Sequence, residues 1–183
     1  SIQGSLKEME TDTQFYVSQD PLEAMHMGQY FGSCLSLSKN HGGINGWASV
    51  VQVMDANKNV IYAKSPDGKY LGRNRTALTD NGVLCTRFYQ NGNLYLGDAW
   101  IDYLCQFSDH TTQDVMIPTM FTQSAMSSKL EEMTKTERVT KEQRTMHIEP
   151  AYFNAFYGDG IPALKLPDGR IQITTEVYAI KPN

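Results

Sequence analysis

The sequence has few cysteines, and none of them stands in a paired motif. Cys34, Cys85 and Cys105 are far apart in a chain of 183 residues. A sparse, odd set without C-x-x-C spacing excludes a disulfide framework and a cysteine zinc site, and it suits a reducing compartment, the cytoplasm. The four histidines are scattered without ligand spacing, so we expect no metal. We expect Cys85 and Cys105, which lie in apolar segments, to be small core residues.

A long apolar run and an excess of positive charge are also missing. No stretch approaches the roughly 20 apolar residues that cross a bilayer, and the first residues do not form a signal peptide. The formal net charge of −4 argues against an electrostatic nucleic-acid binder. We therefore expect a soluble protein that uses neither membrane nor nucleic acid as a partner.

The chain starts at Ser1 without a methionine. We interpret this start as that of an excised domain, a processed product or a tagged fragment, so a protein partner or the rest of a larger chain is possible. The oligomeric state stays open.

What the sequence does have is a stretch from Asn59 to Gln90 with two strong turn signals. Ser65-Pro66-Asp67-Gly68 and Thr79-Asp80-Asn81-Gly82 supply the fixed φ and the positive φ that tight reversals need. They predict an antiparallel meander with strands at 60–64, 69–78 and 83–89. Gly72, in the middle strand, indicates a bulge or the close approach of another group.

Around the meander the pattern predicts helices and further strands. Asp20-Pro21 begins a helix that runs to about Phe31, and Trp47, Val50, Val51 and Met54 share one face of another, capped by Asn45, with a strand as the alternative. After the meander we expect a helix capped by Asp98 and a strand at 115–121, in which Pro118 marks an edge, a bulge or the end of the strand. A closing hairpin of 161–166 with 171–180 follows.

The fold class is therefore α+β, or mixed α/β, with a β-β-β-α-β core. We expect a central, mostly antiparallel sheet built on the three-strand meander, helices packed against it and a C-terminal hairpin. Residues 1–19 are predicted to be a loosely attached segment and residues 20–183 a single domain.

Residues 124–146 carry interspersed charges of both signs. This pattern predicts a charged helical excursion with exposed pairs such as Glu131 with Lys135 and Glu137 with Lys141, or else a mobile segment.

Basic side chains gather on the meander. Lys69, Arg73 and Arg75 have the same parity along one predicted strand, close to Lys64, and together they could hold a phosphate or a carboxylate. A solvated sheet face is the simpler interpretation.

A possible nucleophile lies before a glycine-rich loop. Cys34 precedes His41 by seven residues, and a histidine within hydrogen-bond reach activates a cysteine. The alternative is a buried, inert thiol. The loop Asn40-His41-Gly42-Gly43 is a flexible connection or an anion-binding nest.

The order of elements from 59 to 121, with the late Tyr157-Gly158-Asp159-Gly160 and its hairpin, resembles the GNAT-type acyltransferases. The resemblance implies an acyl-coenzyme A site at the turn between the meander and the next helix, here residues 90–97, with Gln90, Gly92, Asn93 and Gly97 as its candidate residues. The spacing of these residues differs from the Q/R-x-x-G-x-G/A loop of the family. The alternative interpretation is therefore a degenerate member that keeps the scaffold of the family with an altered coenzyme A loop.

The sequence leaves three functions open. The first is an acyltransferase-like domain, active or degenerate; the second is a non-catalytic interaction module of a larger protein; the third is a thiol enzyme that uses Cys34 and His41.

Overall fold

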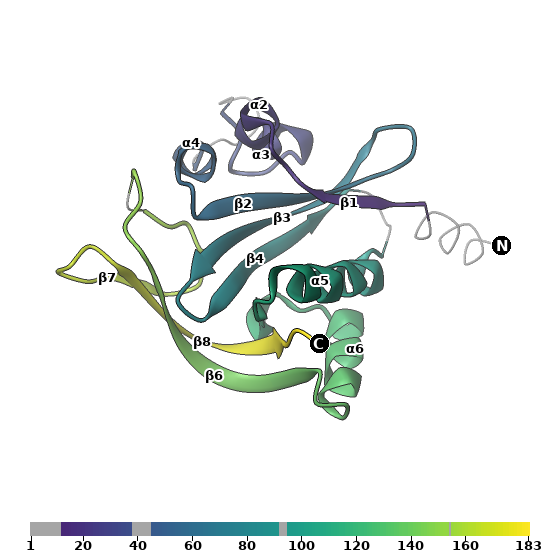
Figure 1. Cartoon of the computed structure of the whole chain (residues 1–183). Helices are drawn as coiled ribbons and strands as arrows, with labels where there is room; N and C mark the ends of the chain where they lie inside the picture. Colours follow the sequence, from purple (N-terminus) through teal and green to yellow (C-terminus); the bar gives the residue numbers. More distant parts are fainter. Residues whose placement is uncertain (1–11, 38–44, 92–94, 154) are drawn as a thin grey trace.

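The computed structural model describes residues 12–37, 45–91, 95–153 and 155–183. In this part of the chain one sheet has the strand order β1-β2-β3-β4-β5-β8-β6, with β7 also beside β8 (Figure 1). Only β4 and β5 pair in parallel, so the predicted α+β class with a mostly antiparallel sheet is confirmed. The strands are β1 (Gln14–Val17), β2 (Lys58–Lys64), β3 (Tyr70–Thr79), β4 (Gly82–Gln90), β5 (Val115–Pro118), β6 (Val139–Ile148), β7 (Ala163–Lys165) and β8 (Ile171–Ile180).

The predicted meander is present as β2, β3 and β4. Each is antiparallel to the next. Gly68 and Gly82 stand in the two turns with φ of 84° and 123°, values that L side chains rarely adopt. The turn chemistry of the sequence therefore fixes the centre of the sheet.

Helices cover both faces of the meander. The helices α2 (Pro21–Met25), α3 (Met27–Tyr30) and α4 (Trp47–Met54) lie on one side of it, and α5 (Gly97–Thr111) and α6 (Ser124–Thr134) on the other (Figure 1). Side chains of β2 alternate between the two resulting cores: Val60 and Tyr62 pack toward α2–α4, and Ile61 and Ala63 toward α5 and α6. None of the described helices is long and apolar enough to cross a bilayer.

Several predicted boundaries need correction. The cap of α5 is Leu96 and not Asp98, and β5 ends at Pro118, after which Thr119–Phe121 form a 3-10 helix. The expected single helix from Pro21 to about Phe31 is broken at His26, whose ring Nδ1 lies 2.7 Å from the carbonyl oxygen of Leu22. In α4 the cap is Gly46 and not Asn45. Trp47 and Met54, expected on the buried face, are 47% and 51% exposed.

The charged segment after residue 124 is helical only as far as Thr134, so the prediction of a helix to about 146 is wrong. The following residues form β6, which pairs with β8 over ten positions. Val139 is buried in the core beside α5 and α6, and Met146 and Ile148 are buried in a second core, and this burial outweighs the charge pattern. Lys141 pairs with Glu131 of α6 and Lys135 with Glu132, so neither predicted i,i+4 pair forms. The predicted hairpin partner β7 does pair with β8, over a shorter length.

Gly72 marks a close approach, as its place in mid-strand indicated. A Cβ atom there would lie 2.4 Å from Cζ3 of Trp100, a fully buried residue of α5. The helix can therefore pack on the meander only where β3 has no side chain.

Replacing Gly72 with alanine should destabilise the protein by about 2 kcal/mol, because the added methyl group overlaps a closely packed ring. Urea unfolding measures the change. In the background of Trp100→Phe, which removes the ring atoms in question, the same glycine substitution should cost less than about half as much. Equal costs in the two backgrounds would contradict this account.

Candidate functional site

Two arginines of β3 are buried on the face covered by α2–α4. Arg73 is 0% and Arg75 2% exposed. Arg73 lies opposite Tyr62 of β2 and Tyr89 of β4, and Arg75 lies opposite Val60. The interpretation of this face as a solvated one is therefore wrong.

Lys69 does not belong with the two arginines. Ala63 pairs with Gly72 and Lys64 with Tyr70, so Leu71 has no pairing partner in β2. Because of this bulge, residues before Leu71 no longer share a face with the residues of the same parity after it. The side chain of Lys69 is 78% exposed beside Asp67.

Arg73 has no anionic partner among the described residues. Its guanidinium lies 4.2 Å from the ring centre of Tyr89 and 5.8 Å from that of Phe31, and its Nη2 donates to Ser33 Oγ at 3.0 Å. Nε and Nη1 have no hydrogen-bond acceptor. Burial, and then the neighbouring Arg75, lower the pKa of Arg73 to about 10. The side chain remains a cation at neutral pH, and its charge is not balanced.

Arg75 has a partner from the other end of the chain. Its Nη2 donates to Asp159 Oδ2 at 2.6 Å, and both side chains are 3% exposed. The amide of Arg87 also donates to Asp159, at 3.4 Å. The register of β3 with β4 is interrupted beside Arg87, and the bulge turns this amide away from the ladder. The carboxylate of Asp159 therefore accepts from one guanidinium group and one backbone amide.

A thiol, a phenol and an amide stand next to the arginines. The Sγ of Cys34 lies 3.7 Å from the hydroxyl oxygen of Tyr157 and 3.6 Å from Nδ2 of Asn45. Asn45 Nδ2 also donates to the Tyr157 hydroxyl at 3.1 Å. The ring of Tyr157 lies 5.1 Å from the guanidinium of Arg75. Burial, followed by the contact with Cys34, raises the pKa of Tyr157 to about 12, so this phenol keeps its proton.

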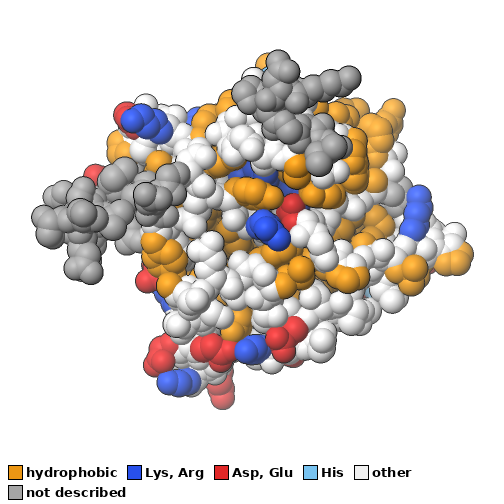
Figure 2. Space-filling model, turned by 180° about the vertical axis from the view of Figure 1, so that it is seen from behind, with side chains coloured by type: hydrophobic (Ala, Val, Ile, Leu, Met, Phe, Trp, Pro, Cys, Tyr) orange, Lys and Arg blue, Asp and Glu red, His pale blue; other side chains and the backbone are white. Residues whose placement is uncertain are grey.

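We call this group the arginine cluster; its members are Arg73, Arg75, Asp159, Tyr157, Cys34 and Asn45. Figure 2 shows the side of the molecule opposite to the view of Figure 1, and its surface is hollowed near the centre. Basic and acidic side chains lie near that hollow among hydrophobic ones.

The sequence indicated part of this cluster. The pattern indicates Arg73, Arg75 and Cys34 as residues that could carry chemistry, and His41 lies outside the described residues. It does not assign Asn45, Tyr157 or Asp159 to a site. The only signal for the last two was the glycine-flanked stretch from Tyr157 to Gly160, since residues more than 80 positions from Arg73 have no spacing that links them to it.

The second predicted site lies where β4 and β5 separate. The two strands are in register only at Val83 with Val115 and at Leu84 with Met116. Beyond these pairs β4 continues to Gln90, and β5 ends at Pro118. The helix α5 begins at Gly97, shortly after this opening. Gln90 and Gly97 flank the turn, and Gly92 and Asn93 lie outside the described residues.

The described residues of this turn do not fit the pyrophosphate of coenzyme A. The amide of Leu96 already donates to Gln90 Oε1 at 2.9 Å. The hydroxyl of Tyr95 lies against Gly97 and donates to the carboxylate of Asp98 in the first turn of α5. A carboxylate at this position opposes a bound anion. The cavity beside these residues has a volume of about 20 Å³, enough for about one water molecule.

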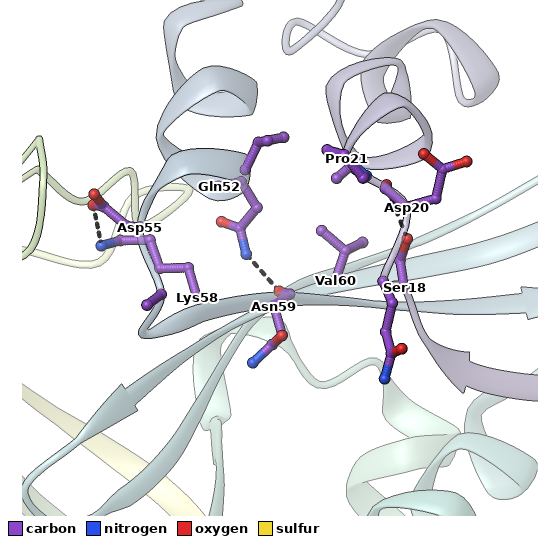
Figure 3. A pocket seen from close by; sticks show the side chains of 12 residues that line it. Ser18, Asp20, Pro21, Gln52, Asp55, Lys58, Asn59 and Val60 are labelled. Carbon is purple, nitrogen blue, oxygen red and sulfur yellow. Dashed lines mark hydrogen bonds and ion pairs between the residues drawn. The ribbon is translucent and has the colours of Figure 1, made fainter.

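A larger cavity of about 340 Å³ lies between α2, α4 and β2 (Figure 3). Its polar side chains already bind protein groups: Lys58 pairs with Asp55 at 2.7 Å, and Gln52 donates to the carbonyl of Asn59. A ligand there would have to replace bonds that exist, whereas the free N–H groups of Arg73 need an acceptor. The arginine cluster is therefore the stronger candidate site.

Neutral substitutions of the two arginines should have opposite effects. Arg73→Met removes a buried cation without an anionic partner, so the variant should be at least as stable as the wild type. Arg75→Met leaves Asp159 buried and unpaired, and should cost about 3 to 5 kcal/mol. Urea unfolding of both variants measures the difference.

The double variant Arg75→Met/Asp159→Asn is the control, because it removes both charges of the pair and should recover part of the loss. A large loss of stability in Arg73→Met would instead identify Arg73 as a structural residue held by Tyr89, Phe31 and Ser33.

No protein-family model matches the chain, and no curated protein sequence matches it. Among solved structures the chain is similar in fold to GNAT-type acetyltransferases. An acetyltransferase of Corynebacterium glutamicum is 8% identical with a TM-score of 0.49, and 93% of this chain and 96% of that one are covered. A spermidine/spermine N-acetyltransferase of Vibrio cholerae is 7% identical with a TM-score of 0.49, and 94% of each chain is covered. A phosphinothricin acetyltransferase of Sinorhizobium meliloti, solved with acetyl-CoA, is 7% identical with a TM-score of 0.47. The match covers 94% of this chain and 89% of that one. The likeness concerns the course of the backbone alone.

Proposed function

We propose that this chain is an acyltransferase-like domain that binds a small anionic ligand at the arginine cluster. The observation that supports this most is the buried guanidinium of Arg73, whose Nε and Nη1 have no acceptor and which no described carboxylate neutralises. A buried charge of this kind costs several kcal/mol unless something pairs with it. A carboxylate or phosphate would supply the missing acceptors.

The charges of the cluster favour an anion. Two guanidinium groups and the single carboxylate of Asp159 leave one positive charge in a region of low polarity. Cys34 and Tyr157 are half-buried and form the accessible side of the cluster. We propose that an anion enters from that side and supplies acceptors to the free N–H groups of Arg73.

A coenzyme A-dependent acyltransferase is the second candidate. The separation of β4 and β5 next to the start of α5 favours it, because such an opening exposes backbone amides at a helix N-terminus. Gln90, Tyr95 and Asp98 oppose it, since they occupy or repel the position of a phosphate. We therefore propose that the domain is degenerate with respect to coenzyme A.

Succinate should stabilise the wild-type protein in thermal unfolding, whereas the neutral analogue succinamide should not. At a ligand concentration of about ten times Kd the expected gain is about 1.4 kcal/mol. Arg73→Met should abolish the gain, because it removes the unbalanced cation. Inorganic phosphate serves as a second anion, and all samples are held at the same ionic strength.

Lys135→Met is the matched control for this measurement. It also removes one positive charge, but the Lys135 side chain is 71% exposed, at the C-cap of α6. The control should keep the full response to succinate. An equal response of Arg73→Met and the wild type would mean that the anion binds elsewhere or not at all, and the proposal would fail.

Acetyl-CoA at about 1 mM should leave the unfolding temperature unchanged, because Gln90 occupies the amide of Leu96 and the carboxylate of Asp98 repels the phosphates. A stabilisation by acetyl-CoA that persists in Arg73→Met would contradict the degenerate character of the domain and support the second candidate. Isothermal titration calorimetry gives the corresponding affinity.

A further inference from the structure

Cys34 is held in a fixed position at the arginine cluster. Asn45 binds it twice: its backbone amide donates to the Cys34 carbonyl at 2.8 Å, and its side chain reaches Sγ at 3.6 Å. The hydroxyl of Tyr157 contacts the same sulfur at 3.7 Å. The thiol is half-buried, so reagents can approach it.

Both arginines connect to the surroundings of this thiol. Ser33, the residue before Cys34, accepts the only side-chain hydrogen bond of Arg73 that the described residues show. The hydroxyl of Tyr157 contacts the Cys34 sulfur, and the ring of the same residue lies 5.1 Å from the guanidinium of Arg75. A ligand whose acidic group faces the arginines would therefore bring its next atoms toward the sulfur.

The other two cysteines have different environments. Cys85 lies in β4 and is 0% exposed, and burial raises its pKa far above the ordinary range. Cys105 lies on α5 in the other core, and burial raises its pKa as well. Both serve as internal references on the same chain.

We infer that Cys34 is a nucleophile that reacts with a small carboxylate carrying an electrophilic carbon. In this step the sulfur gives an electron pair to that carbon and an S–C bond forms. The bond from the carbon to its leaving group breaks, the leaving group departs with its electron pair, and the thiol proton passes to water. The inference rests on the proposed anion site, which would hold the carboxylate during the reaction.

Iodoacetate and iodoacetamide test this inference on the intact chain. The two reagents share the leaving group and are similar in size, but only iodoacetate is an anion. The ratio of the iodoacetate rate to the iodoacetamide rate at Cys34, followed by peptide mass spectrometry, should exceed the ratio for Cys105 by about tenfold, because a cationic site concentrates an anion.

Arg73→Met should lower the iodoacetate rate at Cys34 by about tenfold and change the iodoacetamide rate by less than about twofold. Arg73→Lys keeps the charge and should retain the preference for iodoacetate. If Arg73→Met does not fold, a protection experiment on the wild type replaces this variant. Succinate should slow the reaction of Cys34 with iodoacetamide, and succinamide should not.

The outcomes separate the two proposals. If Cys34 reacts no faster than Cys105 with either reagent while succinate still stabilises the wild type through Arg73, the nucleophile is refuted and the anion site stands. If Cys34 reacts quickly but without preference for iodoacetate, and succinate has no effect, the anion site fails and the inferred reaction with a carboxylate fails with it.

Discussion

The ion pair between Arg75 and Asp159 holds the arginine cluster together. It joins the middle strand of the meander to a segment 84 residues further along the chain, with a separation of 2.6 Å in a buried environment. Such a pair is stable only when the geometry is good and the remaining oxygen lone pairs are bonded. The amide of Arg87 supplies such a bond, so the bulge in β4 and the ion pair depend on each other.

Two irregularities of the sheet decide what the cluster contains. The bulge at Leu71 brings Tyr70, Arg73 and Arg75 to the face below α2–α4, and leaves Lys69 outside. The interruption beside Arg87 places Tyr89 under the guanidinium of Arg73. Bulges of this kind reorient side chains without ending a strand, which is why they often accompany binding sites.

The arginine cluster and the β4–α5 turn have opposite electrostatic character. The cluster has a buried positive charge in excess, whereas the first turn of α5 carries the carboxylate of Asp98. The positive end of the helix dipole near Asp98 is thus compensated within the chain itself. We therefore propose that an anionic ligand binds at the first site and not at the second, although the backbone around the second is open.

The sequence by itself determined the meander, its two turns, α5 and the strand β5, because Pro-Asp-Gly, Asp-Asn-Gly and a regular apolar period act over a few neighbouring residues. It also singled out Cys34, Arg73 and Arg75. It could not show that β6 is a strand, since the preference of a charged segment is settled by its pairing with β8. Only the tertiary structure decided that the arginines are buried, and that Asn45, Tyr157 and Asp159 meet them. These contacts join parts of the chain that share no local pattern, and they depend on sheet register and bulges that no short-range preference encodes.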